Sequence, residues 1–356
     1  MELRELNKTH IEAAESAALS WLTYGFNKFH RTGFPHSRIW YLPSSISWRK
    51  PYPETTGYLI ENFLDFNKDQ IPDAEKIALQ AGNWLCSIQS EKGYYYSGIK
   101  KEKISSFNTS QILFGLISCY ENNHEDIFEQ AASNAYNFLL NQLDGVGRWT
   151  QGLYVNNYFP AYYSRAIWPM LLYKKKWGHS GQLEHSLNYL FDYRCDNYFF
   201  MNAGFYPGQN PLSHNLAYTL EGFAESSIIL QRDDIFQFVM NSLETLGNQI
   251  IKKNYLAGSY DVNWNGNYTF NCVVGQAQFA SLFVKAFIWT NNILFKTIAI
   301  KLFQELLPYQ NTSPDPEYYG SFASSIPNYG KYFPFQTVNW TQKFFLDACY
   351  YIKKIV

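Results

Sequence analysis

The chain has 356 residues, of which 46% are hydrophobic, and a formal net charge of −1 from 29 Lys and Arg against 30 Asp and Glu. This balance excludes extended nucleic-acid binding, which needs a basic surface to displace the counterions around phosphate. No apolar run is long enough to cross a bilayer, and the charged first residues do not resemble a signal peptide. We therefore expect a cytoplasmic protein without stable membrane insertion.

Aromatic residues make up 19% of the chain, with 29 Tyr, 28 Phe and 10 Trp. Tyrosine and tryptophan combine an apolar ring with a polar tip, which suits a wall that stacks on sugar rings and hydrogen-bonds to them. A codon usage that favours Tyr, Phe and Asn produces the same composition, so both explanations stay open. The five cysteines are dispersed without C-x-x-C spacing, which predicts reduced, buried thiols.

Helical periodicity recurs along the whole chain and predicts twelve helices. In chain order they are expected at about 9–26, after 53, at 73–89, from 108, at 127–143, from 162, at 183–192, from 213, from 233, from 272, at 294–306 and from 339. The members alternate between two types. Odd helices are amphipathic, with outward charges such as Glu12, Glu15 and Asp233, whereas even helices are apolar almost all round and must be buried on all sides.

Six such hairpins predict an all-α fold, the (α/α)6 toroid, with the apolar helices as an inner barrel. An open solenoid is the alternative, but it needs polar capping repeats, and the final helix KFFLDACYYI is apolar. We expect one domain over residues 1–356. The loops that lead into the inner helices are long and rich in Gly, Asn and aromatic residues, so the face that carries the inner-helix N-termini is expected to hold a site.

Polar residues concentrate in the first turns of the inner helices, where they are expected to meet around a central cleft. They are Glu54 with Tyr58; Asn108 with Gln111; Tyr162 with Arg165; His214 with Tyr218 and Glu221; Gln276 with Gln278; and Asn339 with Lys343. Each of these residues also has an ordinary structural explanation, such as helix capping. We expect Trp264, Trp340 and Tyr206 to add sugar-stacking surfaces, and we find no convincing metal or cofactor motif.

The two carboxylates suggest glycoside hydrolysis as one chemistry. Helix N–H groups should lower the pKa of Glu54, and desolvation should raise the pKa of Glu221. Split pKa values of this kind are what an acid and base pair on a glycosidic bond requires.

A second chemistry is removal of the C5 proton of a uronic acid. Tyr218, His214, Tyr162 and Tyr58 are the acid and base candidates, with the tyrosine pKa values expected to be lowered by a nearby Arg. Arg165 and Asn108, with Gln111, Gln276, Gln278 and Lys343, would hold the sugar and its carboxylate. This set suits C5 epimerisation or β-elimination.

Several stretches resemble known families. PYPETTGYLI, FNTSQILFGL, YYSRAIWPMLL, PLSHNLAYTLEGF, VVGQAQFASLF and VNWTQKFFLDA together resemble toroid proteins encoded among bacterial surface-polysaccharide genes, often given a prenyltransferase or terpene-cyclase-like label. NPLSHNLAYTLEGF followed by GQAQFASLFVKAF is similar to the helical domain of D-glucuronyl C5-epimerases, whose active residues are Tyr and Glu. Isoprenoid cyclisation is disfavoured because the chain has no D-x-D-D and no complete D-D-x-x-D.

Glu54 and Tyr58 also resemble the S-E-G-x-x-Y helix start of inverting cellulases, although Pro53 and Thr55 replace the flanking residues. Our leading expectation is a carbohydrate-active enzyme that acts on C5 of a uronic-acid-containing surface glycan or precursor, whether polymeric, lipid-linked or nucleotide-linked. The alternatives are a glycoside hydrolase that uses Glu54 and Glu221, and a glycan-binding or assembly protein without catalytic activity.

Overall fold

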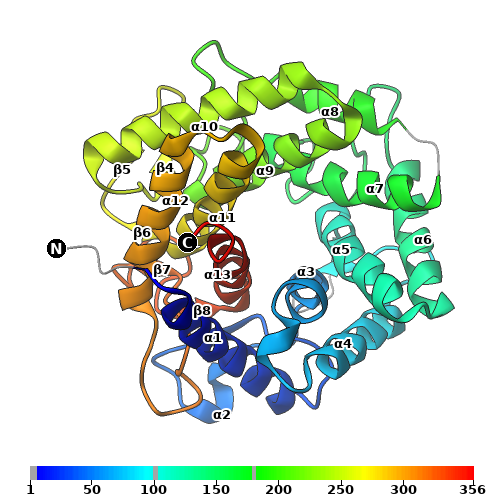
Figure 1. Cartoon of the computed structure of the whole chain (residues 1–356). Helices are drawn as coiled ribbons and strands as arrows, with labels where there is room; N and C mark the ends of the chain where they lie inside the picture. Colours follow the sequence, from blue (N-terminus) through cyan, green and yellow to red (C-terminus); the bar gives the residue numbers. More distant parts are fainter. Residues whose placement is uncertain (1–5, 99–102, 179–181) are drawn as a thin grey trace.

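The computed structural model describes residues 6–98, 103–178 and 182–356. Helices dominate these residues and form two concentric rings (Figure 1). The outer ring holds α1 (Lys8–Lys28), α4 (Ala74–Ile88), α6 (Asp126–Asn141), α8 (Leu183–Phe191), α10 (Asp233–Lys253) and α12 (Ile293–Leu306). The inner ring holds α3 (Pro53–Glu61), α5 (Ser106–Asn123), α7 (Ser164–Trp177), α9 (Ser213–Leu230), α11 (Val273–Thr290) and α13 (Asn339–Ile352). The fold is an all-α toroid, and the expected alternation of outer and inner helices is confirmed.

Shorter elements complete the chain. They are the helix α2 (Ser44–Ser47), the π-helical turn η1 (Asn62–Phe66) and the 3-10 turns η2 (Lys68–Gln70), η3 (Ala161–Tyr163) and η4 (Leu307–Tyr309). Each of the five cysteines is a free thiol; Cys119, Cys272 and Cys349 are buried as expected, whereas Cys86 and Cys195 are only half-buried. None of the helices in the described ranges combines the length and the apolar character that a bilayer crossing requires.

The inner helices are buried because their sequences are apolar on every face, and their few polar side chains pair within the barrel. The outer helices bury one face only and carry most of the charges on the other. Glu15 is an exception to our expectation of an outward charge on α1. It is fully buried, and its carboxylate accepts from Lys353 Nζ at 2.7 Å, so it ties the first helix to the end of the last.

The ring closes because α13 packs against α3 as well as α11. Asn339 Nδ2 donates to Thr55 Oγ1 at 2.8 Å, and the rings of Tyr58 and Phe344 lie 5.8 Å apart. A two-stranded sheet, β1 (Ser37–Ile39) with β8 (Gln336–Val338), joins the same two parts of the chain. An open solenoid is therefore excluded.

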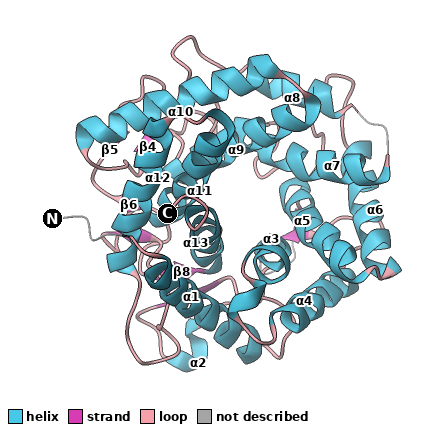
Figure 2. Ribbon diagram, in the orientation of Figure 1, coloured by secondary structure: helices cyan, strands magenta, loops and turns pink. Residues whose placement is uncertain are grey.

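Three further antiparallel pairs lie in the loops near the starts of inner helices (Figure 2). They are β2 (Tyr96–Ser97) with β3 (Lys103–Ile104), β4 (Ser259–Tyr260) with β5 (Gly266–Asn267), and β6 (Asn271–Cys272) with β7 (Ser325–Ile326). β3 ends just before α5 and β6 ends directly before α11, whereas β4 and β5 lie in the loop between α10 and α11. These pairs fix the loops around the mouth of the barrel, where the inner-helix N-termini meet.

Candidate active site

A cavity of about 630 Å³ opens at the N-terminal ends of the inner helices. Its wall is largely aromatic, and aromatic faces are a common lining of ligand cavities. The aromatic residues that line it are Tyr52, Tyr58, Phe107, Tyr154, Tyr162, Phe205, Tyr218, Tyr332, Phe333 and Trp340. Among the described residues, Glu54 is the one acidic side chain in this lining.

Glu54 lies directly after Pro53 in the first turn of α3, and its accessible surface faces the cavity. Tyr52 donates from its hydroxyl to Glu54 Oε2 at 3.0 Å, and Asn108 Nδ2 donates to that same hydroxyl at 3.1 Å. Burial raises the pKa of Glu54 to about 7, although the Tyr52 hydrogen bond and the charge of Arg165 oppose this shift. Our expectation of a lowered pKa was wrong, because the loss of water outweighs the helix N–H groups.

His214 lies at the second position of α9, and 3% of its surface is accessible. Its Nδ1 is 2.6 Å from Gln278 Oε1 on α11. Since an amide oxygen accepts only, Nδ1 carries the proton and Nε2 carries a free lone pair. Burial lowers the pKa of His214 to about 4, so the ring is neutral at pH 7.

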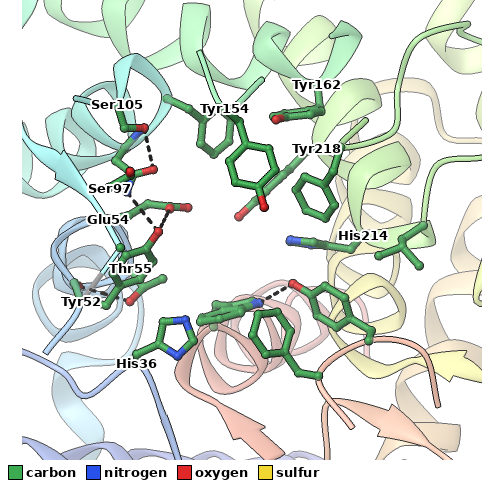
Figure 3. A pocket seen from close by; sticks show the side chains of 18 of the residues that line it. His36, Tyr52, Glu54, Thr55, Ser97, Ser105, Tyr154, Tyr162, His214 and Tyr218 are labelled. Atoms are coloured by element: carbon green, nitrogen blue, oxygen red, sulfur yellow. Dashed lines mark hydrogen bonds between the residues drawn. The ribbon is translucent and has the colours of Figure 1, made fainter. Parts of the chain in front are cut away.

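Glu54 and His214 extend into the cavity from opposite sides and face one another (Figure 3). Tyr218 and Tyr162 line the wall between them. The structure thus places a carboxyl group with a pKa near neutrality across from a neutral imidazole, which is a suitable pair for moving protons to and from a bound molecule.

Tyr58, Tyr162 and Tyr218 all line the cavity, but their phenols remain protonated. Burial raises the pKa of each above the ordinary value, and for Tyr218 this outweighs the lowering effect of Arg165. The expectation of a tyrosine activated by arginine was therefore wrong. These phenols can donate hydrogen bonds to sugar oxygens.

Arg165 and Glu221 lie beneath the cavity rather than in its lining. Arg165 Nη1 donates to Glu221 Oε2, and Lys285 Nζ donates to Glu221 Oε1 at 2.8 Å. Burial alone would raise the pKa of Glu221, but the charges of Lys285 and Arg165 outweigh it and lower the pKa to about 2. The expected raised pKa is therefore wrong, because two buried cations pair with this carboxylate.

The same internal layer holds two other residues that we expected to bind substrate. Gln111 Oε1 accepts from Arg165 Nε at 3.1 Å, and Lys343 Nζ donates to Asp347 at 2.7 Å. The guanidinium carbon of Arg165 lies 4.9 Å from the ring centre of Tyr218. The layer is thus a charged support beneath the cavity floor.

Of the remaining residues that we expected to bind substrate, some line the cavity and others make structural hydrogen bonds away from it. Trp340 lines the cavity and donates from Nε1 to the Tyr332 hydroxyl at 2.8 Å. Gln278 acts on the site through His214. Gln276 donates to Leu302 O at 2.9 Å, and Trp264 donates from Nε1 to Asn197 O at 3.0 Å, so both are held away from the cavity lining.

Sequence reasoning missed several residues of the lining. Tyr52 stands two residues before Glu54, and Tyr332 and Lys331 lie in the long loop before α13 that we had identified as functional. Lys103 lies in β3, just before α5, and His36 precedes β1. The aromatic and basic composition of these loops was the available signal, but the sequence alone did not show which side chains turn inward.

Solved structures resemble this chain over nearly its whole length. An unsaturated glucuronyl hydrolase specific for heparin superposes with a TM-score of 0.74 at 10% identity, covering 98% of each chain. Cellobiose 2-epimerase from Bacillus thermoamylovorans superposes with a TM-score of 0.70 at 12% identity, covering 98% of this chain and 100% of the epimerase. A novel alpha-amylase from Clostridium perfringens superposes with a TM-score of 0.67 at 12% identity, covering 95% of this chain and 97% of the amylase.

No protein-family model matches the sequence, and no curated protein matches it. At 10–12% identity the three structural similarities establish the toroid fold. A hydrolase, an epimerase and an amylase share that fold, so the reaction has to be argued from the side chains of this cavity.

Proposed function

We propose that the protein is a carbohydrate-active enzyme that removes the C5 proton of a uronic acid in a surface glycan or its precursor. The observation that carries this proposal is the pair of Glu54 and His214 on opposite sides of an aromatic cavity. The fold shared with an unsaturated glucuronyl hydrolase and a sugar epimerase supports a saccharide substrate.

His214 is the proposed base. Its Nε2 lone pair takes the proton from C5, and the electron pair of the C–H bond moves into the adjacent carboxyl group of the sugar. In epimerisation, protonated Glu54 then delivers a proton to C5 from the opposite face. In elimination, the electron pair forms the C4–C5 double bond, and Glu54 protonates the oxygen that leaves C4.

The charges around the cavity suit an acidic sugar. Lys103 and Lys331 line its mouth, and Glu54 is half protonated near pH 7. With Arg165 committed to Glu221, these two lysines are the proposed partners of the sugar carboxylate. An anionic substrate also favours the protonated forms of Glu54 and His214, which eases proton removal by the imidazole.

The structure gives less support to hydrolysis by Glu54 and Glu221. Hydrolysis by two carboxyl groups requires both of them beside the scissile bond. Glu221 is instead held below the floor by Arg165 and Lys285. The pair of opposed proton-transfer groups in the cavity is Glu54 with His214.

Solvent exchange tests this function directly. In deuterium oxide, epimerisation by the wild-type protein should place deuterium at C5 of a glucuronate or iduronate residue in an oligosaccharide, whereas elimination should give a C4–C5 unsaturated product; mass spectrometry and NMR detect both. Glu54→Gln and His214→Asn should each lower the exchange rate by about 10²-fold or more. Binding of the oligosaccharides without exchange or elimination would instead identify a glycan-binding protein.

A further inference from the structure

A series of neighbouring aromatic rings leads from His214 to the molecular surface. The ring centre of Phe205 lies 6.4 Å from that of His214 and 6.0 Å from that of Tyr154. Tyr154 lies 5.6 Å from Tyr206, and their hydroxyls are 3.1 Å apart. The aromatic wall of the cavity therefore continues outward beyond Tyr154.

Tyr154 and Tyr206 form an aromatic pair that is exposed to solvent. Their accessible fractions are 58% and 50%, although the ring of Tyr154 also lines the cavity. Exposed aromatic surface that is continuous with a cavity is typical of a ligand site. The hydroxyl contact fixes the two phenols relative to one another, which lowers the entropy lost when a ligand stacks on them.

A second exposed pair borders the cavity mouth. Tyr41 and Phe335 are 71% and 41% accessible, and their rings lie 6.3 Å apart. Phe335 and the cavity-lining Phe333 have positive φ angles of 57° and 46°, which bulky residues rarely adopt. The loop before α13 therefore presents aromatic side chains at the mouth despite an unfavourable backbone.

We propose that Tyr154 and Tyr206 form an outer subsite for a further sugar ring, so that the substrate is a saccharide chain. This inference rests on the proposed function for the identity of the inner site. The occupant follows from the continuity of the wall and from its chemistry. The two rings offer apolar faces with hydroxyls beside them, which suit stacking and hydrogen bonding with a sugar ring rather than the charge of a phosphate.

The size of the cavity agrees with a chain. A volume of about 630 Å³ lies well within the range of about 300–1,000 Å³ that encloses drug-sized ligands, and it exceeds the space of one sugar ring. A chain with one ring between Glu54 and His214 can therefore place its neighbouring ring against Tyr154 and Tyr206.

The test compares binding by the double variant Tyr154→Ala/Tyr206→Ala with that by the wild type. Calorimetry would measure hyaluronan and heparosan oligosaccharides of two, four and six sugars, with UDP-glucuronate as the nucleotide-linked probe. We expect wild-type affinity to rise from two to four sugars, and the double variant to lose about tenfold for four sugars and little for two. Tyr154→Phe/Tyr206→Phe should retain most of the affinity, since the rings remain.

Tyr309→Ala is the matched control, because Tyr309 is 47% exposed in η4 and does not line the cavity. Its affinities should equal those of the wild type, and equal thermal melting would show that each variant is folded. Equal wild-type affinity for every chain length, absence of binding by all chains, or a tyrosine-dependent preference for UDP-glucuronate would overturn the outer subsite.

Binding and exchange separate the two proposals. Length-dependent binding that requires the tyrosines, with neither deuterium exchange at C5 nor an unsaturated product, would contradict the proposed reaction and leave the outer subsite intact. Exchange into single uronates with no effect of chain length or of the tyrosine substitutions would support the reaction and contradict the outer subsite.

Discussion

His214 Nδ1 on α9 lies 2.6 Å from Gln278 Oε1 on α11. This contact joins two inner helices and determines which ring nitrogen bears the proton. Because the amide oxygen holds the Nδ1 proton, Nε2 is the lone-pair nitrogen and the atom through which the ring can take up a proton.

Gln278→Glu should change the pH range of activity. A carboxylate beside Nδ1 stabilises the imidazolium, so the pKa of His214 should rise from about 4 by roughly 1–3 units. The acidic limb of the kcat/KM profile should therefore move to higher pH. NMR titration of the His214 ring gives a readout independent of activity, and an unchanged ring pKa would contradict the assigned contact. Gln278→Leu, which cannot orient the ring, should lower kcat without moving the acidic limb upward.

The alkaline limb should report Glu54. If protonated Glu54 is the acid, kcat/KM falls as pH rises through about 7. Tyr52→Phe removes the hydrogen bond that lowers the Glu54 pKa, so the limb should move to higher pH while activity is retained. The profiles of wild type and Tyr52→Phe would be compared with the same oligosaccharide. Activity that increases through pH 7 would show that Glu54 acts as the base.

Glu221→Gln should lower the free energy of unfolding strongly, although Glu221 does not line the cavity. It removes the carboxylate that pairs with buried Arg165 and leaves Lys285 with Glu225 alone, which destabilises by about 3–5 kcal/mol. Urea unfolding at pH 7 would measure the loss. Glu225→Gln is a milder control, because Glu225 pairs with Lys285 but not with Arg165.

The pH dependence of that difference is a second readout. The folded-state pKa of Glu221, about 2, lies below its ordinary value of 4.5. Its stabilisation is therefore present above pH 4.5 and is lost as pH falls through about 2. The difference in unfolding free energy between wild type and Glu221→Gln should become smaller as the pH falls over that range. A difference that stays constant would argue against the ion pairs as its cause.

The fold followed from the sequence because burial on all sides is visible as an apolar helix with no polar face. KFFLDACYYI and FNTSQILFGL cannot face water, so closure into a ring was the simple solution. Glu54, Tyr58, Asn108, Tyr162, His214, Tyr218 and Trp340 were found for a related reason. They stand in the first turns of those helices, or beside them, and the topology brings those turns together.

The pKa values could not be predicted because they depend on partners distant in sequence. Glu221 is 64 residues from Lys285 and 56 from Arg165, and those contacts reverse its expected shift. The lysines at the cavity mouth could not be predicted either, because Lys103 and Lys331 lie in loops whose composition does not determine side-chain direction. Helix periodicity predicts neither the long-range partners that shift a pKa nor the direction of a side chain in a loop.

Gly115→Ala should weaken the contact between α3 and α5. A Cβ at Gly115 would lie 2.2 Å from Gly57 O, which is backbone that cannot move without shifting the helix. We expect a loss of about 1–3 kcal/mol in unfolding free energy, measured by urea titration. Gly247→Ala in α10 is the matched control, because its nearest new contact would be 3.6 Å. That variant should be neutral or more stable, since alanine favours a helix by up to about 1 kcal/mol.

Glu54→Gln should make the protein more stable at alkaline pH while it slows proton transfer. The folded-state pKa of Glu54, about 7, lies above its ordinary value of 4.5, so its contribution is full below pH 4.5 and is lost as pH rises through 7. Glutamine has no charge to bury. At pH 8 the variant should gain on the order of 1–2 kcal/mol over the wild type, and at pH 4 the two should be similar. Urea unfolding at both pH values measures this difference, with Glu75→Gln on the outer helix α4 as a control that should show none. A wild type as stable as the variant at pH 8 would mean that the ionised carboxylate is well solvated, and Glu54 would then lack the raised pKa on which its role as the acid depends.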